Sequence, residues 1–129
     1  MTEPVWILDE VAQAIHSILL SEHGGGTGIR DEALLESALS RPQQKYNYEP
    51  TTSIFELAAA YSFSIASNHP FVDGNKRTAF TVGTLFLEMN GVLLIAPEPD
   101  AAITFENLAA GKISEKELAV WFGENSRRA

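Results

Sequence analysis

The order of apolar and polar residues along the chain is that of a helical protein. Apolar side chains recur every three or four residues over residues 10–22, 32–40, 54–67 and 75–90. Asp100 is expected to cap a fifth helix that runs to about residue 110, and the capping box Ser114–Glu117 begins a sixth. Residues 92–96 are an apolar run typical of an extended segment. We therefore predict an all-α fold with at most a short extended segment or hairpin.

Polar residues between these segments predict where the helices begin and end. Asp9 and Asp31 are expected to cap the first two helices, and Pro42 is expected to follow the end of the second. Residues 43–52 are polar and aromatic, which predicts an irregular loop or a short hairpin. The tyrosines of this loop either contact a protein partner or pack at its base, and the sequence leaves both interpretations open.

The composition narrows the classes of function. With 129 residues, of which 45% are hydrophobic, the chain can build the core of a single domain spanning residues 1–129. The net charge of −8 argues against direct nucleic-acid binding, because such binding depends on cations that meet phosphate. The absence of cysteine excludes disulfides and suits a reducing cytoplasm. The chain has no apolar run long enough to cross a membrane and no secretory signal, so we expect a cytoplasmic protein without membrane contact.

A glycine-rich stretch, residues 24–31, invites comparison with phosphate-binding loops. It matches neither the G-x-x-x-x-G-K-[ST] pattern nor the G-x-G-x-x-G pattern, and no strand is predicted before it. We interpret it as a flexible turn between two helices, with a contact between Arg30 and an anion as the minor alternative. His16, on the first predicted helix, has no partner nearby in the sequence, and we interpret it as a structural or surface histidine.

The stretch His69–Arg77, with the sequence HPFVDGNKR, carries the densest set of reactive side chains. It leads into a predicted helix that is apolar on nearly all sides and is therefore expected to be buried. The N-terminus of such a helix offers free main-chain N–H groups and the positive end of the helix dipole, which together bind anions. Gly74 lets the main chain approach a ligand closely, and Asn75 either caps the helix or orients a phosphate. Lys76 and Arg77 oppose the helix dipole in its first turn, which indicates a bound anion that offsets them.

Two titratable side chains of the same stretch suit group transfer. His69 is the side-chain type whose ionisation lies nearest neutral pH, which suits a general base. Asp73 is a hard oxygen ligand, and a carboxylate together with substrate phosphates is the usual way in which a protein holds Mg²⁺. Phe71, between them, is expected to point into the core and anchor the loop. A base, a metal-binding carboxylate and an anion site together predict transfer of a phosphorus-containing group to a hydroxyl.

His69–Arg77 resembles the nine-residue signature of the Fic/Doc superfamily, which is highly specific. The resemblance to the death-on-curing (Doc) branch of that superfamily covers most of residues 6–95. Its further segments are Gly24-Gly25, Gly28-Ile29-Arg30-Asp31, Leu34-Leu35-Glu36-Ser37-Ala38-Leu39, Arg41-Pro42-Gln43 and Asn90-Gly91. The resemblance implies a compact bundle of about six helices, with the motif between two central ones.

The resemblance also implies a function. It implies a toxin of a type II toxin–antitoxin pair, similar to a kinase that phosphorylates a threonine of elongation factor Tu and so stops protein synthesis. ATP would be the phosphate donor and Mg²⁺ the metal. By position, His69 would be the general base, Asp73 the Mg²⁺ ligand, and the phosphate contacts would be Asn75, Lys76 and Arg77.

Two positions within the motif point to different reactions. Fic enzymes that transfer AMP usually carry glycine where this chain has Lys76, and a lysine there crowds the phosphate pocket, which favours transfer of the terminal phosphate. The prototype of the Doc branch carries alanine where this chain has Gly74, the Fic-type residue. AMP transfer to a protein hydroxyl is therefore the alternative. A non-catalytic subunit that binds an antitoxin and tunes the antitoxin's DNA binding is a second alternative.

Many Fic proteins carry their own inhibitory helix with the pattern [ST]-x-x-x-E-[GN]. The nearest segment here is Thr52–Leu57, in which Leu57 stands at the last position and breaks the pattern. By analogy, we expect a separate antitoxin whose helix covers the site. The expected partners are thus a cognate antitoxin and a protein substrate, elongation factor Tu.

Overall fold

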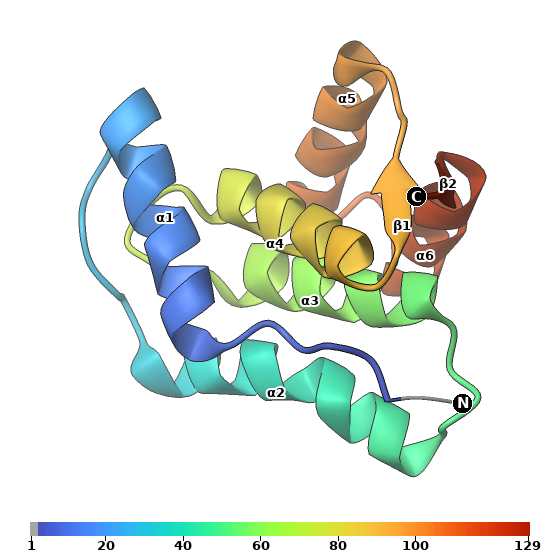
Figure 1. Cartoon of the computed structure of the whole chain (residues 1–129). Coiled ribbons are helices and arrows are strands. Elements are labelled where there is room, and N and C mark those ends of the chain that lie inside the picture. The colour runs from blue at the N-terminus through green and yellow to red at the C-terminus, as the bar shows by residue number, and fades with distance from the viewer. Residues whose placement is uncertain (1–2) are drawn as a thin grey trace.

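The computed structural model describes residues 3–129, and within that range the chain forms six helices and two short strands (Figure 1). The elements are α1 (Asp9–His23), α2 (Glu32–Tyr48), α3 (Ile54–Asn68), α4 (Asn75–Met89), β1 (Val92–Leu94), α5 (Glu98–Ala109), α6 (Glu115–Glu124) and β2 (Ser126–Arg128). The strands pair antiparallel, with Leu93 opposite Arg127. The predicted all-α fold with at most a hairpin is confirmed. Within residues 3–129, no helix is both long enough and apolar enough to cross a membrane.

Helix α3 lies at the centre of the bundle and packs against α2, α4 and α6 (Figure 1). Its alanines Ala58, Ala59 and Ala60 are fully buried, and their small side chains let neighbouring helices approach closely. The approach of α4 is tightest at Gly83, where an added Cβ would lie 2.2 Å from Ser62 Oγ. The α3–α4 pair is therefore a rigid base for the loop that joins the two helices.

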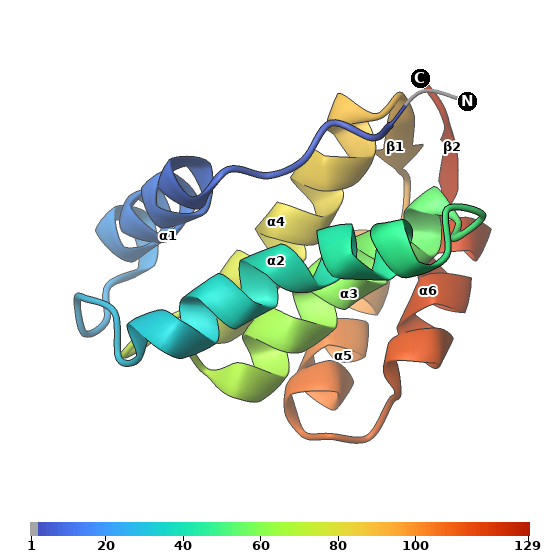
Figure 2. The same cartoon turned by 90° about the horizontal axis from the view of Figure 1, so that it is seen from below.

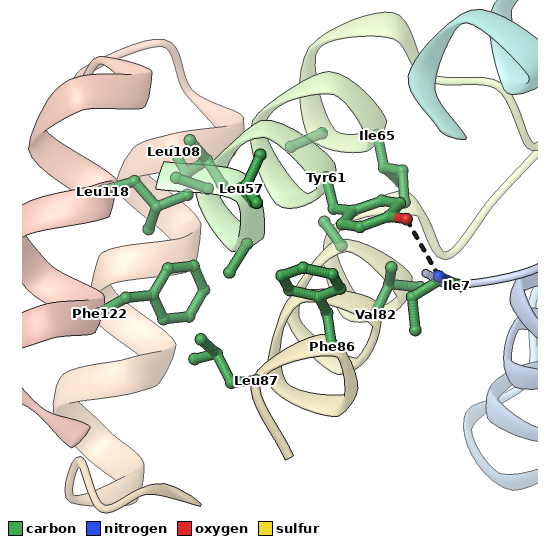
Figure 3. Close-up of a cluster of buried hydrophobic side chains, with 14 of the residues drawn as sticks. Ile7, Leu57, Tyr61, Ile65, Val82, Phe86, Leu87, Leu108, Leu118 and Phe122 are labelled. Atoms are coloured by element: carbon green, nitrogen blue, oxygen red, sulfur yellow. Dashed lines mark hydrogen bonds between the residues drawn. The ribbon is translucent and has the colours of Figure 1, made fainter. Parts of the chain in front are cut away.

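Aromatic and aliphatic side chains of α3, α4 and α6 fill the core (Figure 3). Tyr61 and Phe86 pack with their ring centroids 5.1 Å apart, and Phe122 is fully buried beside them. The Tyr61 hydroxyl accepts a hydrogen bond from the Ile7 N–H at 3.0 Å, which fastens the N-terminal segment to the core. Burial raises the pKa of Tyr61 to about 12, because the phenolate would lose its hydration.

The predicted loop at residues 43–52 is wrong over its first half. Helix α2 continues through Pro42 to Tyr48 and lies along α3 as one continuous helix (Figure 2). Proline removes one helical hydrogen bond. Because Pro42 itself is fully buried, packing against the core offsets that loss. Of the two tyrosines, Tyr46 packs edge-on against Trp6 with the ring centroids 5.6 Å apart, whereas Tyr48 is 92% exposed.

Two predicted helix caps are also wrong. Leu8 rather than Asp9 is the N-cap residue of α1, and no side chain caps that end. Helix α5 begins at Glu98, so Asp100 lies in its first turn instead of at its cap. The first turn of a helix tolerates proline because its N–H groups have no partner within the helix, and Pro99 accordingly lies inside α5.

Three other helices begin at a side-chain cap, and two of these caps, Asp31 and Ser114, are confirmed predictions. Asp31 caps α2, its carboxylate accepting from the Leu34 N–H at 3.0 Å. Ser53 and Ser114 open α3 and α6 with complete capping boxes. Each cap satisfies a main-chain donor that the first helical turn leaves free, so these three helices have sharply defined beginnings.

Candidate active site

The His69–Arg77 stretch forms the turn between α3 and α4, next to α1 (Figure 1). Helix α3 ends at Asn68, and His69 follows as its C-cap in the left-handed conformation, with φ 50° and ψ 57°. Pro70 follows, and because a residue before proline is disfavoured in the helical conformation, the helix does not continue through His69. Helix α4 begins after Gly74, which has a φ of 76° and provides no side-chain cap. The main-chain N–H groups of the first turn of α4 are therefore open to a ligand.

Two buried side chains hold the interior of this turn together. Phe71 is 1% exposed, and its ring stacks on His16 of α1 with the centroids 3.8 Å apart and the planes at 9°. The Asn75 amide accepts from the Phe71 N–H and donates to the Phe71 carbonyl, both at 3.0 Å. The Asn75 side chain thus closes a ring with the main chain of the turn.

Asp73 lies at the surface of the turn, and hydrogen bonds hold both its main-chain carbonyl and its carboxylate. Its carbonyl accepts from His16 Nε2 at 2.7 Å, and since a carbonyl cannot donate, Nε2 carries the hydrogen. Its carboxylate accepts from the Gly74 N–H at 2.8 Å and from the Gly26 N–H at 3.3 Å. His16 is therefore a structural residue, with partners that lie 57 residues away.

The Asp73 carboxylate is suited to bind Mg²⁺. Each of its oxygens accepts one hydrogen bond, and a carboxylate has about four acceptor positions, so room remains for a cation. Among residues 3–129 no group of three or more histidine, aspartate or glutamate side chains surrounds a common point. A metal at Asp73 would consequently take most of its ligands from nucleotide phosphates and water, as Mg²⁺ usually does.

The glycine-rich stretch between α1 and α2 is paired with the turn along its length. The Val72 N–H donates to the Gly28 carbonyl at 3.1 Å, and Ile29 forms an antiparallel bridge with Phe71. Gly25 has a φ of 125°, which residues with a side chain rarely adopt, and an added Cβ would lie 2.8 Å from Asp73 Oδ2, so this position favours glycine. The interpretation of the stretch as a simple inter-helix turn missed this pairing. No local signal reveals it, because the paired segments are more than 40 residues apart in the sequence.

On the other side of the turn, the first residues of α4 border a cavity of about 410 Å³. Lys76 and Arg77 of α4 and Glu106 of α5 are among the residues that line it. Lys76 Nζ lies 3.9 Å from Glu106 Oε1, and both side chains are about half or more exposed, so this pair adds little to stability. The remaining lining residues are Leu19, His23, Phe80, Thr81, Glu98, Ala101, Ala102 and Phe105.

A family model described as the Fic/DOC family matches residues 6–87. The chain belongs to the Fic/DOC family. It is 37% identical over 106 residues to a protein named "Protein kinase doc" from Escherichia phage P1, a match that covers 82% of this chain and 83% of the relative. It is 45% identical over 74 residues to "Toxin Doc" from Mycolicibacterium smegmatis, a match that covers 57% of each protein.

The matched region of the Fic/DOC model contains the His69–Arg77 stretch but not the α5 residues that line the cavity. It runs from the segment before α1 into the last turns of α4, and so includes the glycine-rich stretch and the α3–α4 turn. The seven residues of this stretch that were singled out from the sequence differ in burial. The exposed ones are His69, Asp73, Lys76 and Arg77, Gly74 is half-buried, and the buried ones are Phe71 and Asn75.

Proposed function

We propose that this protein is a Doc-type toxin of a type II toxin–antitoxin pair. In this proposal it transfers the terminal phosphate of ATP to a hydroxyl of a translation factor, elongation factor Tu, in the cytoplasm. The observation that carries the proposal is the α3–α4 turn, which presents a histidine, a carboxylate and an uncapped helix N-terminus on nine consecutive residues. The names of the two relatives, a protein kinase and a toxin, support the same reaction class and biological role.

Each part of the turn has a role in this reaction. His69 takes the proton of the attacking hydroxyl, the hydroxyl oxygen forms a bond to the terminal phosphorus, and the bond from that phosphorus to the ADP oxygen breaks. The N–H groups at the start of α4, with Lys76 and Arg77, hold the phosphate oxygens. When bound at Asp73, Mg²⁺ would supply positive charge to the phosphates. ADP leaves with the electron pair of the broken bond.

AMP transfer to a protein hydroxyl is the second candidate, and Gly74 is the residue that favours it. Gly74 has a φ of 76°, a conformation that favours glycine, and an added Cβ would meet Leu20 and His16 at ordinary contact distances of 3.6–3.7 Å. Lys76 favours the terminal phosphate, because a lysine where AMP-transferring Fic enzymes usually carry glycine crowds the phosphate pocket and changes its charge. These two residues decide how the nucleotide lies relative to the turn.

The experiment that separates these candidates uses ATP labelled either on the terminal phosphate or on the α-phosphate. The purified protein is incubated with each label, Mg²⁺ and elongation factor Tu, and the protein fraction is counted. Label from the terminal phosphate alone is the expected result. Label from the α-phosphate alone would replace phosphate transfer by AMP transfer.

A growth assay addresses the non-catalytic alternative. Expression of the wild-type protein without an antitoxin is expected to arrest growth, and the double variant His69→Ala/Asp73→Ala is expected to be harmless. Arrest by the double variant would show that the protein acts by docking alone. Co-expression of the cognate antitoxin is expected to relieve the wild-type arrest, because its helix is proposed to cover the turn.

A further inference from the structure

His69 has a main-chain conformation that its residue type disfavours. Its φ of 50° makes it the one non-glycine residue with positive φ in the described part of the chain, residues 3–129. A side chain with a Cβ is crowded in the left-handed region. His69 also precedes Pro70, and a residue before proline is pushed towards extended conformations. Contacts from outside the turn must therefore hold His69 in place.

Arg30, at the end of the glycine-rich stretch, makes those contacts. Its Nε donates to the His69 carbonyl at 2.6 Å, and its Nη2 donates to the Asn68 carbonyl at 2.7 Å. The Arg30 main-chain N–H donates to the Pro70 carbonyl at 2.7 Å. One residue thus binds three consecutive carbonyls, at positions 68, 69 and 70. The planar guanidinium makes the two side-chain contacts possible, because its N–H groups point in fixed, nearly parallel directions.

The C-terminal end of α3 also favours a cation. Asn68 is the last residue of α3, and the final carbonyls of a helix have no partners within it and carry the negative end of the helix dipole. The guanidinium of Arg30 satisfies one of these carbonyls. Its hydrogen bonds go to the main chain, so the structure does not support the anion contact that the sequence left as a minor alternative.

The main chain of His69 also sets the direction of its imidazole. Over residues 3–129, no hydrogen bond to the ring nitrogens of His69 is found, and the side chain is exposed. The φ and ψ angles of the turn determine the direction of the Cα–Cβ bond, and this direction limits the positions that the ring can reach by rotation about that bond. A general base must lie within hydrogen-bond reach of the proton that it takes.

We propose that Arg30 is a positioning residue that fixes the left-handed turn at His69 and so aims the imidazole at the substrate hydroxyl. The inference rests on the proposed function of His69 as the general base. Arg30 touches neither nucleotide nor substrate in this scheme, so its loss should slow the transfer step and leave ATP binding intact.

The kinetic test compares Arg30→Ala and Arg30→Lys with the wild type. Both variants are expected to lower kcat by about ten- to a hundred-fold, because small misplacement of a reacting group has costs of this size. KM for ATP should stay within about two-fold, since uniform binding is untouched. Arg30→Lys keeps the charge but loses the planar fork, so a wild-type rate in this variant would overturn the proposal. A rise in KM with unchanged kcat would also overturn it and indicate an anion contact.

Arg41→Ala is the matched control. Arg41 is another partly exposed arginine, and it pairs with Glu115 of α6 instead of with the turn. Its replacement is expected to leave kcat unchanged. If Arg30→Ala does not fold, Arg30→Lys carries the same test, because it retains the positive charge at the end of α3.

A second readout is independent of catalysis. In the wild type, NMR should show a strong intraresidue NOE between the amide and α protons of His69, which marks a positive φ. The NOE should weaken in Arg30→Lys and stay unchanged in Arg41→Ala. An unchanged NOE in Arg30→Lys would overturn the proposal even if kcat fell. If the wild type transferred no phosphate at all, the proposed function would fail, and the NOE alone would decide whether Arg30 fixes the turn.

Discussion

The ring that Asn75 closes with Phe71 gives the sharpest stability test of the site. The change Asn75→Ala removes the two 3.0 Å hydrogen bonds between the amide and the main chain of Phe71. Both residues are buried, so water cannot readily replace the lost partners. The Phe71 N–H and carbonyl would then be left unpaired inside the turn that carries the reactive side chains.

The expected cost follows from those two groups. A buried main-chain donor or acceptor left without a partner costs about 1–3 kcal/mol, so two of them cost about 2–6 kcal/mol. The higher helix propensity of alanine returns about 0.5 kcal/mol. We expect a net loss of about 3 kcal/mol in the free energy of unfolding. For a chain of this size, that loss lowers the Tm by roughly 10 °C.

Asn90, at the other end of the same helix, provides the matched control. Its amide pairs with the main chain of Val5 at 2.8 and 3.0 Å and with the Phe86 carbonyl at 2.8 Å. These groups are more exposed, so we expect Asn90→Ala to cost about 1–2 kcal/mol. Its transfer rate should equal that of the wild type, whereas Asn75→Ala should lose at least about ten-fold in kcat because the turn is released.

The assay combines thermal and urea unfolding with phosphate transfer below the Tm of both variants. If Asn75→Ala melted together with the wild type, the two hydrogen bonds would contribute nothing to stability, which contradicts the expected loss. If Asn75→Ala were as destabilised as expected but transferred phosphate at the full rate, the expected loss in kcat would be contradicted. In that case the ring would stabilise the fold without positioning the site.

Three further outcomes are expected. Gly74→Ala should lower stability by about 1–2 kcal/mol through the φ of 76°, as measured by urea unfolding. Gly83→Ala should cost about 1–3 kcal/mol through its clash with Ser62 Oγ, and Ser62→Ala should relieve much of that loss in thermal melts. The pKa of the Tyr61 phenol is about 12 in the folded state and near 10 in the unfolded chain. The free energy of unfolding should therefore fall by about 1.4 kcal/mol per pH unit between pH 10 and 12. Tyr61→Phe should remove this slope, as measured by urea unfolding at several pH values.

The helical pattern of the sequence predicted the elements that local chemistry controls. The capping residues Asp31, Ser53 and Ser114 sit where their side chains bind the first helical turn, and that preference is visible within four residues of sequence. The pattern failed at Pro42, where burial between helices outweighs a local helix breaker. It also missed β2, because Ser126–Arg128 is polar and pairs with β1 through the main chain alone.

The residues of the candidate site also divide into those that the sequence predicted and those that it did not. The His69–Arg77 motif predicted the exposed residues, since His69 and Asp73 are chemically distinctive side chains at a fixed spacing. The residues that hold the turn were hidden, because each lies far from it in the sequence. His16 reaches Asp73 from 57 residues away, and Arg30 reaches His69 from 39 residues away. Such contacts depend on the packing of α1 and α2 beside the turn, which no local pattern encodes.

The proposed reaction centre at the α3–α4 turn is tested most directly by one rate. Transfer of the terminal phosphate to elongation factor Tu is measured in a single turnover with saturating ATP for the wild type and for His69→Ala. A general base contributes about 10²–10⁴-fold, so the variant should be slower by that factor while its ATP affinity stays at the wild-type value. A His69→Ala variant that transfers phosphate at the wild-type rate would contradict the assignment of His69 and, with it, the proposed chemistry of the turn.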